Sequence, residues 1–596
     1  MTRKHRPRDA GHSDRKRGQP RWRADHQPKP DTRPNCEAPR PLVSRLIGME
    51  TEYATLIVGS DQIEQKDLPA SHKVYSALCD AIRRDQPTVA GVFDHEQLFL
   101  ANGGAVTFES HPTMHSNPGG FIEIATPEVR EPTELLACQK SIDALATDAA
   151  ADSLTGFDIR ILKNSSDALG HVYGCHENYQ TDVASGIWLL IYRGFILLLW
   201  AMQVISLVIS LPVMAGILCV ILLCKLFKGQ TVSLDRPQDL FESVPGWLSN
   251  PLLGVLRCVH LPTVIVLRFV ARHVSFRRQR KYLTAFLVSR VAICGTGVLD
   301  PSGRYQLSAK AMAIDAVSDM GGFKGERPIF VHGHWLGQFC AKSFFSLAST
   351  KQMFGRKQRF QIGLSDSNLS DLAEYVKVGS VSLLLDMIES KHRAKLPLLK
   401  SPLKAIHRIA TDWNLVSRVA TNRGEMSALD IQKAYLSAAE NFVASVPADL
   451  RGEAPQVLIR WRELLNAVLA FRKDPSDVSD AIGRVDWLTK RVLIDELGTD
   501  AEWAARKKVD LRYHELSNDG YYQQLLVTVP GIRLVENSEI ERRRRSPPSS
   551  SPAARRGWLI REFADSEEIM QSDWGFAVIG HGRQRRRVQF TDVQHV

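Results

Sequence analysis

The sequence IWLLIYRGFILLLWAMQVISLVISLPVMAGILCVILLCKLF, from Ile187 to Phe227, decides how this chain is organised. Arg193 is its only charged side chain before Lys225. A bilayer core of about 30 Å needs about 20 apolar residues per helical crossing, so the stretch is long enough for two crossings. Pro212 lies just past the middle, where a helix is expected to break. The pattern predicts a transmembrane hairpin that enters and leaves on one side; a buried helix of a soluble domain is the alternative.

Both ends of the chain are basic. The net charge is +11 over 596 residues, and residues 1–40 carry 12 Lys and Arg against 5 Asp and Glu. This proline-rich segment is expected to be disordered. A second low-complexity basic tail is predicted for 536–596, which includes RRRRSPPSSSPAARR (Arg542–Arg556). Basic tails suit anionic lipid or nucleic acid; without an aromatic-interleaved motif, no nucleic acid is expected.

Polar residues recur at strand ends in the first half of the chain. Leu42–Tyr53 is predicted to be a strand in which Glu50 and Glu52, two apart, share one face. Paired carboxylates suit a hard cation such as Mg²⁺, although exposed strand glutamates are also common. Val92–Pro112 is predicted to form a strand pair with an Asn-Gly turn. Lys163–Tyr179 is dense in Asn, Asp, Gly and His, as is typical of a site loop.

Several motifs occur in a fixed order along the chain. They are GMETEY (Gly48–Tyr53), NGGAVTFE (Asn102–Glu109), IEIATPE (Ile122–Glu128), NSSDALGHVYGCHENY (Asn164–Tyr179), RYQLSAKA (Arg304–Ala311), SDSNLSDLAEYVKVGS (Ser365–Ser380) and DLRYHELSNDGYY (Asp510–Tyr522). Together they resemble the Pup ligase and Pup deamidase/depupylase family over roughly residues 42–180 and 283–525. That family has the glutamine synthetase-like fold of the carboxylate-amine ligases.

The resemblance implies an α+β fold: a curved antiparallel sheet that cradles ATP and Mg²⁺, with helices, a small C-terminal lobe and the transmembrane helical hairpin as an insertion. Both ends of the insertion return to one catalytic domain, which requires an even number of crossings. Leu252–Ala271 is predicted to be an interfacial helix, or a further membrane segment, beside the basic run Arg272–Tyr282. The predicted parts are 1–40 (basic tail), 41–180 (first catalytic half), 181–282 (membrane insertion), 283–480 (second catalytic half), 481–535 (C-terminal lobe) and 536–596 (basic tail).

The resemblance also implies site residues. The metal-binding glutamates of the family fall on Glu50 and Glu123, and its ATP-contacting threonine and tryptophan fall on Thr126 and Trp487. The position of its catalytic aspartate is Glu109.

This sequence departs from the family at several polar positions. Glu109 replaces the aspartate, and the longer side chain displaces a carboxylate by about 1 Å, which can cost on the order of a hundredfold in rate. Ala105 replaces an ATP-binding arginine, Thr107 a metal-binding tyrosine and Gln361 a histidine. An insertion, Thr113–Gly120, separates Glu109 from Glu123. A degenerate, slow or repurposed site is therefore an open alternative.

The resulting expectation is a membrane-anchored, ATP- and Mg²⁺-dependent enzyme acting on a glutamate or glutamine amide or isopeptide bond of a Pup-like modifier. The motifs after residue 300 favour the deamidase branch and the short connection after ETEY favours the ligase branch; we lean to deamidase. Alternatives are a catalytically inactive membrane-bound adaptor for a Pup-like tail and a small-molecule carboxylate-amine ligase. Expected partners are the modifier, its conjugates, membrane lipid and a proteasome-linked protein. With nine cysteines and no CxxC pair, the catalytic domain and both tails are expected on the cytoplasmic side.

Overall fold

The computed structural model describes residues 40–58, 68–109, 121–153, 157–227, 246–321, 325–341, 352–390, 392, 395–529, 533–564, 566, 568, 570–580 and 582–590. Apart from Arg40, these residues belong to one compact unit, Pro41–Val596. The predicted basic tail 1–40, except Arg40, and the insertion Thr113–Gly120 lie outside the described residues.

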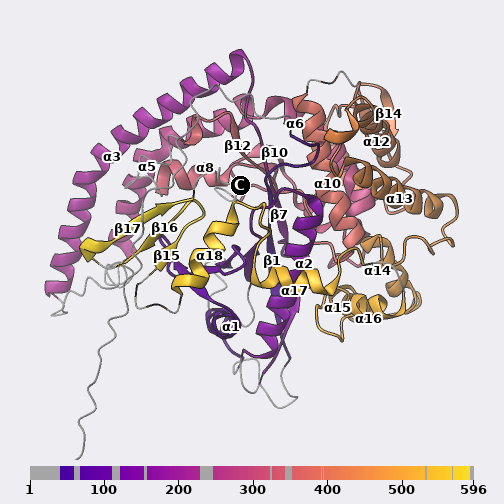
Figure 1. Cartoon of the computed structure of the whole chain (residues 1–596), viewed down its shortest axis with the longest axis horizontal. Coiled ribbons are helices and arrows are strands. Elements are labelled where there is room, and N and C mark those ends of the chain that lie inside the picture. Colours follow the sequence, from indigo (N-terminus) through magenta and orange to yellow (C-terminus); the bar gives the residue numbers. More distant parts are fainter. Residues whose placement is uncertain are drawn as a thin grey trace, which may run out of the picture. The chain divides into compact units, whose positions relative to one another are not determined.

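A mixed sheet of 13 strands runs through this unit (Figure 1). Its centre is antiparallel, with β7 (Cys175–Asp182), β1 (Ile47–Val58), β5 (Phe121–Ala125) and β4 (Ala105–Glu109) side by side. β6 (Asp158–Leu162) pairs with the far half of β1. Beyond β7 follow β12 (Lys357–Ile362), β11 (Pro328–Val331) and β10 (Ala316–Asp319), and beyond β4 follow β3 (Leu98–Leu100) and β2 (Thr88–Gly91).

The strand predicted at Leu42–Tyr53 is confirmed in part, since β1 begins at Ile47 and continues to Val58, and the strand pair around the Asn-Gly turn is confirmed. Gly103 adopts φ 84°, which favours glycine, and the Asn102 side chain accepts the Gly104 N–H at 2.8 Å, so the turn between β3 and β4 is built by its own residues. The α+β fold class is confirmed as well, because this large sheet is combined with many helices.

Helix α10 (Asp371–Glu389) lies buried against the sheet and is nearly inaccessible to solvent all round. Its start is set by Ser370, whose hydroxyl accepts the Ala373 N–H, with acidic residues in the first turn. The helices packed against it are α2 (Pro132–Ala151), α6 (Arg277–Cys294), α12 (Ala428–Ala444) and α13 (Ala454–Lys473). The stretch predicted to be a C-terminal lobe, 481–535, contains α14 (Asp486–Asp495), α15 (Trp503–Arg512) and α16 (Tyr521–Thr528).

The stretch predicted to be a low-complexity tail instead carries secondary structure. It forms α17 (Asn537–Arg545), α18 (Ala553–Phe563), β15 (Met570–Ser572), β16 (Phe576–Ile579) and β17 (Arg586–Gln589). β15 pairs in parallel with β2, so these strands extend the main sheet. Arg556 is fully buried and donates to Glu128 at 2.5 Å, which ties α18 to the residues after β5.

The predicted break at Pro212 is wrong. Helix α3 runs without interruption from Ile187 to Phe227, and Figure 1 shows it as a long curved helix at the periphery. Proline removes one helical hydrogen bond, whereas a turn here would leave several backbone groups without helical partners. The transmembrane hairpin within this stretch is therefore not formed.

Helix α5 (Gly246–Phe269) is the element that packs along α3. The Ser206 hydroxyl donates to the Val259 carbonyl at 3.4 Å, and the rings of Phe195 and Phe269 lie 5.5 Å apart. Among the described residues, one helical segment, Ile187–Pro212, is long and apolar enough to cross a membrane; its mean hydropathy is 2.3. A bent pair of helices would count as a second candidate span, but α6, the second helix of that pair, is largely buried inside the protein.

Candidate functional site

Polar side chains gather on one face of the central strands. Glu50 on β1 pairs with His176 on β7, and Glu52 pairs with Glu123 on β5, which in turn pairs with Thr107 on β4. Alternate residues of paired strands share a face, so these side chains form one row across the sheet. The predicted common face of Glu50 and Glu52 is therefore confirmed, Glu123 lies on the same face, and we call it the cradle face.

Glu50 is held by two donors from β12. One carboxylate oxygen accepts a hydrogen bond from Arg359, and the other accepts from the Gln361 amide at 2.9 Å. Arg359 also donates to the Asn178 side chain at 2.8 Å. The sequence identified Gln361 only as the replacement of a family histidine. In the structure its amide and the guanidinium of Arg359 together occupy the carboxylate of Glu50, the predicted metal ligand.

His176 lies between these carboxylates as a neutral imidazole. Its Nε2 is 3.8 Å from a Glu52 oxygen, and its buried Nδ1 makes no hydrogen bond within the described structure. Burial, and then the positive charges of Lys310 and Arg359, hold the pKa of His176 well below its usual range. The other Glu52 oxygen accepts the Gly174 N–H at 2.9 Å.

The cradle face does not fit a divalent cation as it stands. In the described parts of the chain, no three His, Cys, Asp or Glu side chains converge on a position that could hold a metal ion. Mg²⁺ requires nearly octahedral oxygen ligation, and both oxygens of Glu50 already accept hydrogen bonds. The positive groups at this face are instead Arg359 and Lys310, whose ammonium donates to the Cys175 carbonyl at 3.0 Å.

The remaining predicted site residues are only partly brought together. The backbone of Glu109 pairs with Phe121 at the end of β4, two positions beyond the Thr107–Glu123 pair; its side chain is outside the described set. Thr126 follows β5, and its hydroxyl oxygen accepts the Met49 N–H at 3.0 Å. This bond closes the end of the β1–β5 ladder.

Trp487 does not reach the cradle face. It is fully buried at the start of α14, donates its indole N–H to the Ala292 carbonyl at 3.0 Å and packs edge-on against Phe471. Its predicted stacking on a purine would require a different arrangement of α14. Ala105 is buried and Thr107 accepts a hydrogen bond from Gln97, so neither supplies the positive charge or phenol that the resemblance implies.

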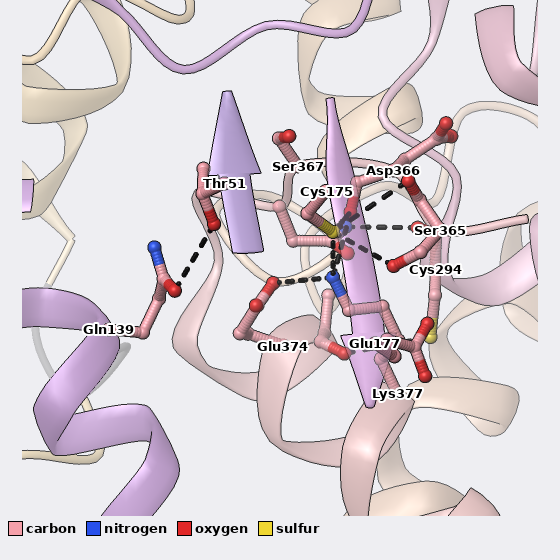
Figure 2. A network of polar contacts seen from close by, with 12 residues as sticks. Thr51, Gln139, Cys175, Glu177, Cys294, Ser365, Asp366, Ser367, Glu374 and Lys377 are labelled. Atoms are coloured by element: carbon pink, nitrogen blue, oxygen red, sulfur yellow. Dashed lines mark hydrogen bonds and ion pairs between the residues drawn. The ribbon is translucent and has the colours of Figure 1, made fainter. Parts of the chain in front are cut away.

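The opposite face of β7 carries a buried polar network (Figure 2). Lys377, on α10, donates to Glu374 at 3.0 Å and to the Asp366 carbonyl at 2.7 Å, and its ammonium lies 3.3 Å from the Cys175 sulfur. Burial raises the pKa of Cys175, which favours a neutral thiol. Glu177 is bound by Arg290 at 2.6 Å.

This network joins segments that are far apart in the sequence. Asp366 accepts hydrogen bonds from the Ser308 hydroxyl at 2.9 Å and from the Thr296 N–H at 3.1 Å. The motifs around 175, 308 and 366 therefore meet behind the cradle and hold β7 rigidly in place. Sequence reasoning missed His176, Lys310 and Arg359; the alternation within CHENY could have indicated that His176 and Glu177 face opposite sides.

Comparisons with known proteins agree with this fold. The family model described as Pup-ligase protein matches residues 45–578. The chain therefore belongs to the Pup ligase family.

The relatives match over most of their length. The Pup–protein ligase of Acidimicrobium ferrooxidans is 25% identical over 509 residues, covering 82% of this chain and 85% of the relative. The Pup–protein ligase of Geodermatophilus obscurus is 25% identical over 564 residues, covering 91% and 94%.

Two solved structures have the same fold. The complex between the prokaryotic ubiquitin-like protein Pup and its ligase PafA matches with a TM-score of 0.60 and 18% identity, covering 92% of this chain and 89% of that chain. The Pup ligase PafA in complex with ADP matches with a TM-score of 0.55 and 19% identity, covering 83% and 85%.

Proposed function

We propose that this chain uses ATP to join the carboxylate of a Pup-like protein modifier to an amine of a protein partner, and that it does so at a membrane. The observation that carries the proposal is the row of carboxylates on one face of a rigid antiparallel sheet, within a chain of the Pup ligase family. The relatives named above are ligases, so we favour ligation over the deamidase direction predicted from the sequence.

The proposed roles follow from the charges at the cradle face. Arg359 and Lys310 supply positive charge that attracts the phosphates of ATP; after burial, these charges also contribute to the lowered pKa of His176. Glu109, at the end of β4, is the carboxylate proposed to accept the proton from the attacking amine. The Mg²⁺ requirement stays a prediction, and no step here depends on the ion.

The test uses the purified full chain with ATP and two modifier-like peptides, one ending in Glu and one in Gln. Ligation predicts ADP release and a conjugate with a lysine-bearing acceptor, from the Glu peptide only. Deamidation predicts ammonia from the Gln peptide and no conjugate. Glu109→Ala should abolish either activity, whereas Glu425→Ala, a surface carboxylate, should not.

A second candidate is an inactive, nucleotide-binding adaptor for a Pup-like tail. The ion pair that occupies Glu50 and the burial of Trp487 favour it. ATP binding without turnover on either peptide, with turnover restored by Glu109→Asp together with Ala105→Arg, would establish the adaptor. ATP hydrolysis with free amino acids but neither peptide would establish a small-molecule ligase instead. A proteasome-linked partner remains a prediction.

We propose that α3, with α5 beside it, anchors the chain in the membrane with the catalytic body and both tails on the cytoplasmic side. One stripe of α3 packs inward through Tyr192, Ile196 and Leu199, which are fully buried. The opposite face is apolar and exposed over about six turns, including Leu190, Leu197, Ile205, Val208 and Leu211 at 55–61% exposure. An exposed apolar strip of this length is typical of a lipid contact.

The anchor is tested with charges placed on that exposed face. Ile205→Glu, Val208→Glu and Leu211→Glu together should move the protein from the membrane fraction to the supernatant. The matched control places three glutamates at other exposed apolar positions, Val416, Ile459 and Val527. The anchor proposal fails if the α3 variant stays in the membrane fraction, or if the wild-type protein is already in the supernatant.

A further inference from the structure

A basic pocket lies where α3 leaves the catalytic body. Its volume is about 650 Å³, and it opens widely to solvent. Trp188, in the first turn of α3, forms part of its wall. Five cations of the stretch before and within the start of α6 line it, with no acidic residue in the lining: Arg272, Arg277, Arg278, Arg280 and Lys281.

Four of these cations have no carboxylate partner in the ion pairs of the described residues. Arg272 alone is neutralised, by Asp319. Arg278 donates to the Ile388 carbonyl at 2.7 Å and Arg280 to the Ser275 carbonyl at 3.0 Å, so these two are held in place by backbone oxygens. Such bonds orient a guanidinium without cancelling its charge, and the pocket therefore keeps a concentrated positive potential.

The charge state of Arg280 agrees with this picture. Burial and the repulsion of Arg277 lower the pKa of Arg280 to about 10. The charged form of Arg280 is therefore destabilised, and an anion at hydrogen-bond distance would stabilise it.

The pocket lies at the boundary between polar and apolar surface. The guanidinium of Arg277 lies 3.8 Å above the Trp188 ring. The neighbouring Ile187 is 64% exposed, and Phe269, at the end of α5, is 46% exposed. A tryptophan and arginines at the end of an apolar helix are typical of the level of lipid headgroups.

We propose that this pocket binds the phosphate of an anionic membrane lipid, with Arg277, Arg278, Arg280 and Lys281 as its donors. This inference rests on the proposed membrane anchor and adds its lipid selectivity. A lipid is favoured over an acidic peptide because Ile187, next to Trp188 and 64% exposed, begins the exposed apolar side of α3, where acyl chains can lie.

The test compares the full chain with two double variants. Arg277→Gln with Lys281→Gln removes two exposed pocket cations, and Lys433→Gln with Lys508→Gln removes the same charge from exposed positions elsewhere. Each protein is mixed with one of two kinds of vesicle. The first contains phosphatidylcholine alone, and the second contains phosphatidylcholine with about 20% of the anionic lipid phosphatidylglycerol, which is enough for electrostatic attraction. The bound fraction is measured by flotation, and the melting temperature in detergent is measured with added phosphatidylglycerol, inorganic phosphate or a glutamate-rich peptide.

The wild type and the control should bind anionic vesicles at least about tenfold more tightly than neutral ones, and phosphatidylglycerol alone should raise their melting temperature. The pocket variant should float with both vesicle types equally. Equal preference for anionic vesicles in all three proteins would overturn the proposal, as would an equal thermal shift from inorganic phosphate or from the peptide. Loss of all flotation by the wild type would instead refute the anchor, so the two failures are distinguishable.

Discussion

At the scale of single residues, the ion pair between Glu50 and Arg359 determines what the cradle face can bind. Each side chain is about one-fifth exposed, so their attraction is only partly screened by solvent. A carboxylate that already accepts from a guanidinium and an amide keeps a free lone pair on each oxygen, but the guanidinium charge repels a cation that would bind there. This pair is the clearest difference between the arrangement observed and the metal-binding role predicted for Glu50.

Replacing Arg359 by glutamine should create a better cation site. We expect the affinity for Mn²⁺, used as a reporter for Mg²⁺, to rise by about tenfold, because Glu50 loses a competing positive charge. Isothermal titration, repeated with EDTA to remove the ion, measures the change. Arg356→Gln is the matched control, since Arg356 pairs with Asp182 instead. An unchanged affinity in the Arg359 variant would mean that Glu50 is not a cation ligand.

The common face of Glu50 and Glu52 could be predicted from the sequence, but the ion pair between Glu50 and Arg359 could not. Glu50 and Glu52 share a face because strands have a period of two, which is a local property. Arg359 lies 309 positions further along the chain. It reaches Glu50 only because β12 pairs with β7 in a particular register, and no local pattern encodes that register. The burial of Trp487 was missed for the same reason, since it depends on how α14 packs.

His332 should make the stability of the fold sensitive to mild acid. Burial, and then the positive charge of Arg280, lower its pKa to about 3 from the usual 6.5. Between these values the unfolded chain binds a proton that the folded chain does not, so stability is lost as the pH falls below 6.5. The melting temperature of His332→Gln should therefore fall less between pH 6.5 and 4 than that of the wild type. His72→Gln, at an exposed histidine, should follow the wild type.

At the scale of elements, α3 shows that apolar length alone does not define a hairpin. The length of the stretch was predicted correctly and its fold was not, because the packing of α5 along it replaces the return limb expected after Pro212. A helix of 41 residues is about 62 Å long at 1.5 Å per residue, twice the thickness of a bilayer core.

Cysteine cross-linking distinguishes the two arrangements. Ser206→Cys with Val259→Cys, in a protein with Cys219 and Cys258 changed to serine, should be joined efficiently by a short bismaleimide. Val208→Cys with Val259→Cys should react poorly, because Val208 is 61% exposed. Mass spectrometry of the joined peptides measures both yields. Equal yields would contradict the observed α3–α5 contact.

Arg556 is one of the buried contacts that fix the C-terminal segment to the body, beside the pairing of β15 with β2. This side chain donates to Glu128 at 2.5 Å and to the Gly103 carbonyl at 2.5 Å, and it stacks 4.7 Å from the Trp574 ring. Composition misled the prediction here because the few apolar residues of this segment, such as Leu559, Ile560 and Ile579, are separated by polar sequence and come together only when the segment packs against the sheet.

Arg556→Ala should leave the buried Glu128 carboxylate without its ion-pair partner and destabilise the docked segment by about 3–5 kcal/mol. Trypsin should then cleave between α17 and α18 much faster than in the wild type, as followed by mass spectrometry. Arg555→Ala, which changes the exposed neighbouring arginine, should leave the cleavage rate unchanged. Equal protease resistance of the two variants would show that the segment is held by other contacts.

At the scale of the whole molecule, one sheet connects three regions: the cradle face, the end of α5 and the C-terminal strands. β1, β5 and β7 carry the cradle face, β10 receives the salt bridges of Arg268 and Arg272 at the foot of α5, and β2 receives the C-terminal strands. The proposed anchor and the proposed site are therefore parts of one compact unit and not modules on a flexible linker.

A rigid anchor should give the enzyme a preference for acceptors in the same membrane. Tethering both reactants raises their effective concentration, which can increase the rate by 10²-fold or more without any new contact, as an order-of-magnitude expectation. We expect conjugation of a lipid-tethered acceptor on the same vesicles to exceed that of the identical soluble peptide by at least about tenfold. The variant with glutamates at 205, 208 and 211 should lose this preference and keep its rate on the soluble peptide, because its substitutions lie on the exposed face of α3. Equal rates on both acceptors in the wild type would show that the apolar helix does not place the cradle within reach of membrane proteins.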